Sequence, residues 1–107
     1  MRSILFVVLL FPFSAYSLVV NQEGCAYFAD AALVARTLSK NNVKRPLANK
    51  IMADIYIIPN LQAQAVISKI ADMAYGSDKA PHEMAGAILK ACYAASGDTD
   101  KFIGTGV

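Results

Sequence analysis

The stretch EGCAYFADAALVARTLSK, residues 23–40, decides the fold, because its apolar side chains recur with the period of an α-helix. The side chains expected on its buried side are Tyr27, Phe28, Ala31, Val34, Ala35 and Leu38. Asn21 suits the N-cap position, and Asn41 and Asn42 are residues that tolerate the left-handed turn at which helices end. This helix carries Cys25 in its first turn, so a disulfide from Cys25 would attach another part of the chain to the start of this helix.

Three further stretches show the same helical period, over residues 46–57, over residues 60–75 and from residue 81 onward. Pro46 and Pro81 suit the first turn of a helix, and the residue before Pro59 is biased away from helix. The positions expected to be buried are Leu47, Ile51, Ile55 and Ile58 in the second helix, Leu61, Ala63, Val66, Ile67, Ile70 and Ala74 in the third, and Met84, Ile88 and Cys92 in the fourth. Lys50 and Asp54 are expected on the outside of the second helix. The sequence therefore predicts an all-α domain, a small bundle of about four short helices within residues 18–95.

The last stretch, residues 96–107, contains three glycines and no sustained apolar period. It is expected to be a flexible C-terminal tail. Its two large apolar residues, Phe102 and Ile103, leave open whether the tail docks on the bundle or on a partner.

The first 17 residues have the layout of a secretory signal peptide. Arg2 supplies a positive start, residues 4–11 are uninterruptedly apolar, Pro12 breaks the run, and Ala15 and Ser17 provide small residues for cleavage. We expect cleavage after Ser17, no stable membrane insertion afterwards, and a location in a bacterial periplasm or in the extracellular medium.

The chain has only two cysteines, Cys25 and Cys92. Exported proteins meet an oxidising environment, in which two such residues form a disulfide. Redox chemistry and zinc binding are disfavoured, because the cysteines are distant in sequence and only one histidine is present to complete a metal site. The expected disulfide joins the first and last helices.

Charge and motifs exclude several classes of function. The formal net charge is +2 and the basic residues are scattered, so no nucleic-acid-binding stripe is expected. His82-Glu83 starts a helical zinc motif, but position 86, where a second histidine is required, is Gly86. Asp98 and Asp100 lack the glycine and glutamate of a calcium loop. We expect no enzyme activity, no metal and no cofactor.

The remaining function is a protein–protein interaction, as a small inhibitor, immunity factor or chaperone-like factor. The residues proposed for its interaction surface are Met52, Tyr56, Met73 and Tyr75. The alternative is a carrier that holds a small apolar ligand between its helices. The layout of export signal, short helices and the pair Cys25 and Cys92 is loosely similar to that of the small periplasmic acid-stress chaperones, without a shared motif. The identity of the partner and the oligomeric state stay open.

Overall fold

The computed structural model describes residues 19–57 and 60–103, and over these residues the protein is all-α. The helices are α2 (Gln22–Lys40), α3 (Arg45–Ile55), α4 (Leu61–Tyr75), α5 (Pro81–Ala94) and the short α6 (Thr99–Ile103). The described part contains no strand beyond an isolated bridge between Val19 and Asp98. None of its helices is both long and apolar enough to cross a membrane.

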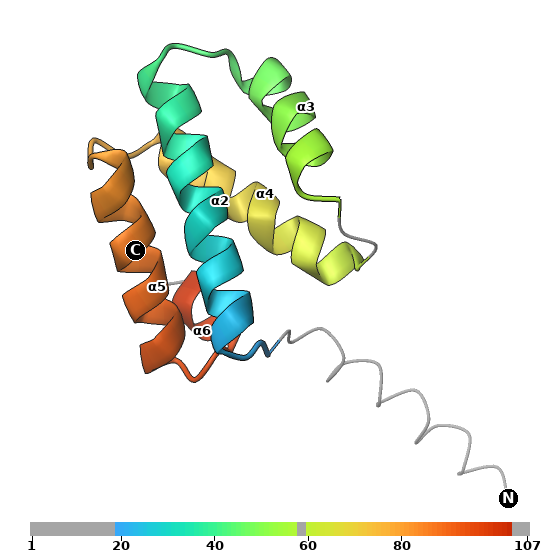
Figure 1. Cartoon of the computed structure of the whole chain (residues 1–107), viewed down its shortest axis with the longest axis vertical. Helices are drawn as coiled ribbons and strands as arrows, with labels where there is room; N and C mark the ends of the chain where they lie inside the picture. The colour runs from blue at the N-terminus through green and yellow to red at the C-terminus, as the bar shows by residue number, and fades with distance from the viewer. Residues whose placement is uncertain (1–18, 58–59, 104–107) are drawn as a thin grey trace, which may run out of the picture.

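Helix α2 is the centre of the bundle (Figure 1). It packs along α5 and crosses α4, while α3 contacts it more sparsely and stands to one side, above α4. Ala31, Ala32 and Ala35 of α2 are fully buried, and such small side chains let neighbouring helices approach closely. Ile70 of α4 and Ile88 of α5 fill the space around them.

Asn21 and Asn42 lie at the two ends of the first helix, as the sequence predicts. Asn21 Oδ1 accepts a hydrogen bond of 2.9 Å from the Gly24 backbone N–H at the start of α2. Asn42 takes a positive φ of 62° just after the end of α2, in the conformation that asparagine tolerates. Glu83 Oε1 accepts a hydrogen bond of 3.0 Å from the Ala80 backbone N–H at the start of α5. These contacts satisfy backbone groups that a helix end otherwise leaves unpaired.

The predicted disulfide between Cys25 and Cys92 is confirmed, and it joins α2 to α5 across a Cα–Cα distance of 5.7 Å. Both cysteines are buried in the core. A disulfide of this kind points to an oxidising, exported environment. The signal peptide predicted in residues 1–17 lies outside the described residues.

The chain after α5 is ordered differently from the tail that the sequence predicts. Residues 99–103 form α6, and Phe102 is only 2% exposed, so the docking that the sequence left open is what the structure shows. The Val20 backbone N–H donates a hydrogen bond of 2.9 Å to the Gly97 carbonyl. Gly97 has a φ of +80°, and a Cβ there would lie 1.8 Å from the Val20 carbonyl oxygen. Residues 104–107 of the predicted tail lie outside the described residues.

The predicted buried faces are right for α4 and α5, apart from Leu61, and wrong for α3. Leu47 and Ile55 are 54% and 52% exposed, and Ile51 is half-buried. The side chains of α3 that enter the core are instead Ala48 and Met52, followed just beyond the helix by Tyr56. Ile58 lies outside the described residues, and Leu61, at the first position of α4, is exposed.

In α2 the buried face is rotated toward Phe28 and Ala32, which leaves Tyr27 38% exposed. The physical reason is the same in both helices. A helical period identifies apolar stripes but not which of two adjacent stripes faces the core.

Candidate functional site

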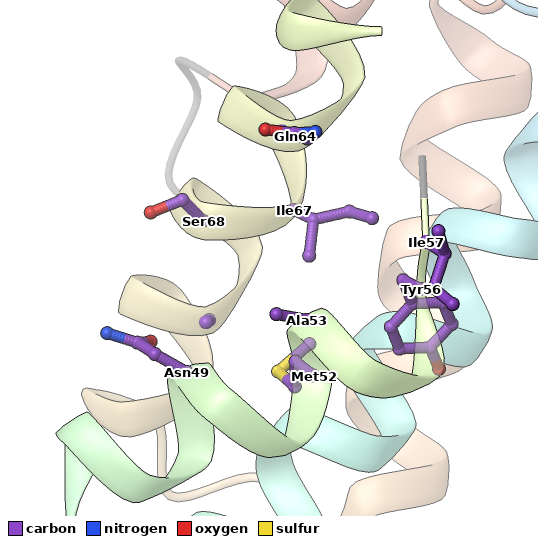
Figure 2. Close-up of a pocket in the computed structure, with 9 residues that line it drawn as sticks. Asn49, Met52, Ala53, Tyr56, Ile57, Gln64, Ile67 and Ser68 are labelled. Carbon is purple, nitrogen blue, oxygen red and sulfur yellow. The ribbon is translucent and has the colours of Figure 1, made fainter. Parts of the chain in front are cut away.

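A groove lies between α3 and α4 (Figure 2). It has a volume of about 360 Å³. Its lining residues are Asn49, Met52, Ala53, Tyr56 and Ile57 on the α3 side and Gln64, Ile67, Ser68 and Ala71 on the α4 side. None of these side chains carries a charge at neutral pH, so the groove favours an apolar or neutral occupant.

The floor of the groove is apolar and its edges are polar. Met52, Ile67 and Ala71 are buried and belong to the hydrophobic core. The floor of the groove is therefore the outer side of the core. Asn49 and Gln64 are exposed and lie on opposite walls (Figure 2). The walls of the groove are thus polar at these two amides, whereas its floor is apolar.

Arg45 holds the start of α3 against α4 at one end of the groove. Its Nη1 lies 2.5 Å from Asp72 Oδ1, and its Nη2 donates to the Ser68 carbonyl at 3.3 Å. Its Nε donates to Asn49 Oδ1 at 2.9 Å, and its guanidinium lies 5.5 Å from the centre of the Tyr75 ring. The planar guanidinium thus fixes two groove-lining residues, one on each wall.

Tyr56 holds the other end of α3. Its hydroxyl donates a hydrogen bond of 2.6 Å to Asp30 Oδ2 on α2, and its ring meets the Tyr27 ring edge to face at a centroid distance of 5.3 Å. Burial of the phenol raises the pKa of Tyr56 well above its usual range, and the hydrogen bond to the Asp30 carboxylate raises the pKa further. The phenol therefore stays protonated and acts as a structural donor.

Two large apolar side chains flank the segment that joins α3 to α4. Ile57 is 82% exposed and Leu61 is 76% exposed. Ile57 also lines the groove. Single exposed aliphatic side chains are ordinary on proteins, whereas here an isoleucine and a leucine are both exposed close to an apolar groove.

The four residues proposed from the sequence for an interaction surface are separated in the structure. Met52 and Tyr56 meet at the groove, where both are largely buried. Met73 is half-buried against the core on α4, away from the groove lining. Tyr75 is half-buried, and its hydroxyl donates a hydrogen bond of 2.6 Å to the Val43 carbonyl. They do not form a single exposed patch, because all four side chains serve packing or hydrogen bonding within the fold.

Sequence reasoning missed the walls of the groove. The signal was present in Asn49, Ala53 and Ile57, which recur at i, i+4 and i+8, and in Gln64, Ser68 and Ala71 on the facing helix. Polar and small residues at such positions are normally interpreted as solvent-facing, and only the placement of α3 beside α4 brings the two rows together.

Chemical groups for catalysis or metal binding do not gather in the part of the chain that the structure describes. Within residues 19–57 and 60–103, no three His, Cys, Asp or Glu side chains are close enough to hold a metal ion. Both cysteines are bonded to each other. His82 is exposed in the first turn of α5.

No protein-family model matches the chain, and no curated protein or solved structure is significantly similar to it. The function is therefore argued from the geometry of the groove.

Proposed function

We propose that this protein is a small exported binding protein that receives an amphipathic helix of a partner polypeptide in the groove between α3 and α4. The observation that carries this proposal is that two large apolar side chains, Ile57 and Leu61, are exposed beside a groove whose floor is formed by the buried Met52, Ile67 and Ala71. Binding would cover this apolar surface, and removal of apolar area from water is the main driving force of association.

The shape of the groove favours a helix over other peptide conformations. Each wall presents side chains over about two helical turns, and the small Ala53 and Ser68 leave room for a second helix to lie close. An extended peptide would need an open strand edge for its backbone hydrogen bonds, and the described residues contain no strand. The partner helix would place apolar residues at i, i+3 or i+4, and i+7 on the floor, with neutral polar residues toward Asn49 and Gln64.

Export supports the choice among functional classes. The disulfide points to an oxidising compartment, and the signal predicted in residues 1–17 would deliver the chain to the periplasm or the medium. A non-catalytic protein that meets its partner there acts as an inhibitor, an immunity factor or a chaperone-like factor.

The test compares variants that fill the groove with a matched variant outside it. Ala53→Arg and Ser68→Arg place a long charged side chain in the groove, and Ala94→Arg makes the same change at an exposed position of α5. Each form is immobilised and incubated with exported protein from the native host. A partner recovered by wild type and by Ala94→Arg but lost with both groove variants supports the proposal. The same partner recovered equally by all four forms contradicts it.

A second candidate function is the carriage of a small apolar ligand, and the size of the groove favours it. A volume of about 360 Å³ lies in the range of small-molecule sites. Native mass spectrometry of protein purified from its own host would then show a bound lipid or metabolite that Ala53→Arg lacks. If the wild-type protein has an unliganded mass and captures its partner only through the groove, the result supports binding of a partner helix over carriage of a small ligand.

A further inference from the structure

Helix α3 carries a second apolar surface that the groove does not use. Leu47, Ile51 and Ile55 recur at i, i+4 and i+8 and form a stripe about two turns long, which we call the outer stripe. Leu47 and Ile55 are exposed, and Ile51 is half-buried. Going around the helix, the buried Ala48 and Met52 separate the outer stripe from the groove wall. The two surfaces therefore lie on opposite flanks of α3.

Two charged residues border the outer stripe along one edge. Lys50 and Asp54 are both exposed, and neither forms an ion pair within the described residues. A lysine four residues before an aspartate is the less favourable order for a salt bridge within a helix. The edge of the stripe thus offers one free positive and one free negative charge, one turn apart.

We propose that the outer stripe is a self-association surface, on which α3 packs antiparallel against α3 of a second copy of this chain. In this arrangement a two-fold axis passes at the level of Met52, so Ile55 of the second copy packs between Leu47 and Ile51, and the reverse. Lys50 then lies opposite Asp54 of the second copy, and the symmetry produces this contact twice. The oppositely charged edge is what selects a second copy as the occupant of the stripe.

The charge pattern also fixes the direction of pairing. If the two helices ran parallel about a two-fold axis, the charged edges of the two copies would lie on opposite sides of the contact and would not meet. The antiparallel arrangement brings both charged edges to the same side of the contact, where each lysine meets an aspartate. The dimer leaves both grooves accessible, because they lie on the other flank of α3. This inference is therefore independent of the function proposed for the groove.

Charge reversal provides the test. Protein is produced from the full-length gene, purified from the exported fraction, and studied by sedimentation velocity and light scattering from micromolar to millimolar concentration. Wild type is expected to reach twice its intact mass. Lys50→Asp and Asp54→Lys each create like-charge contacts and are expected to weaken dimerisation about tenfold or more. The double variant Lys50→Asp/Asp54→Lys exchanges the two charges and is expected to restore the wild-type dissociation constant.

Control variants separate this surface from the rest of the molecule. Lys69→Asp on α4 makes the same charge change away from the stripe, and Ala53→Arg blocks the groove; both are expected to dimerise like wild type. Ile55→Asp is expected to be monomeric, with a circular dichroism spectrum that shows a folded chain. A wild type that stays monomeric throughout overturns the proposal. So does a dimer that is insensitive to the single reversals, or a double variant no better than the singles.

Discussion

Removal of the disulfide by Cys25→Ala/Cys92→Ala should destabilise the protein severely. The two cysteines are separated by 67 positions, so the bond closes a loop around most of the described chain. The chain-entropy model assigns about 4 kcal/mol of stabilisation to a loop of this length. Small domains are stable by about 5–15 kcal/mol in total, so this one bond supplies a large part of the free energy of unfolding.

The assay is thermal and urea unfolding followed by far-ultraviolet circular dichroism. A loss of about 4 kcal/mol corresponds to a fall in Tm of roughly 15–30 °C for a domain of this size. Wild type unfolded in the presence of a reductant is the matched control, because it lacks the bond but keeps both buried sulfur atoms. A double variant within about 1 kcal/mol of the oxidised wild type would refute the loop-closure argument.

Three further predictions concern single side chains. Tyr56→Phe removes the hydrogen bond to Asp30 and should cost about 0.5–1.5 kcal/mol at neutral pH. The raised pKa of Tyr56 gives the wild-type bond a pH dependence: its contribution is complete below the ordinary tyrosine pKa of about 10 and is lost as pH rises above it. Ultraviolet titration should therefore show one tyrosine that ionises only as the protein unfolds, and this delayed fraction should be missing in Tyr56→Phe. Phe102→Ala should destabilise by about 3–5 kcal/mol in urea unfolding, because the ring is buried; a change near zero would mean that α6 does not dock. Gly97→Ala should lower the Tm and increase hydrogen exchange at the Val20 backbone N–H, because the added Cβ meets the Val20 carbonyl at a backbone φ that alanine disfavours; exchange equal to wild type would contradict this.

The parts of the fold that depend on local chemistry were predictable from the sequence. Asn21 lies at the start of α2 because its side chain can accept a hydrogen bond from a free backbone N–H. Asn42 lies just after the end of α2 because asparagine tolerates a positive φ. Pro81 opens α5, and the period of Met84, Ile88 and Cys92 identifies its buried face. The disulfide followed from the number of cysteines alone, once a pair was expected to be oxidised.

The parts that depend on how helices cross were not predictable. The groove exists because α3 lies beside α4, and the residues of its walls, such as Ala53 and Ser68, look like ordinary surface positions in a single helix. The docking of Phe102 was likewise not predictable from the sequence. Its helix, α6, has only five residues, and it follows a positive φ at Gly97. Short segments of this kind derive their helical conformation from packing and not from propensity.

Helix α3 shows why the misassigned face matters for function. Branched aliphatic residues such as Leu47 and Ile55 would normally take the core positions, and burying each would contribute about 1.5–3 kcal/mol. The structure gives these positions to Ala48 and Met52 and holds the helix at its two ends, through Arg45 and Tyr56. A helix attached in this way keeps both of its flanks available. One flank forms a wall of the groove, and the other presents an apolar stripe with opposite charges along its edge. Leaving these aliphatic side chains in water forgoes stability that the fold could otherwise have, and the contacts proposed with other chains would recover it by removing the side chains from water.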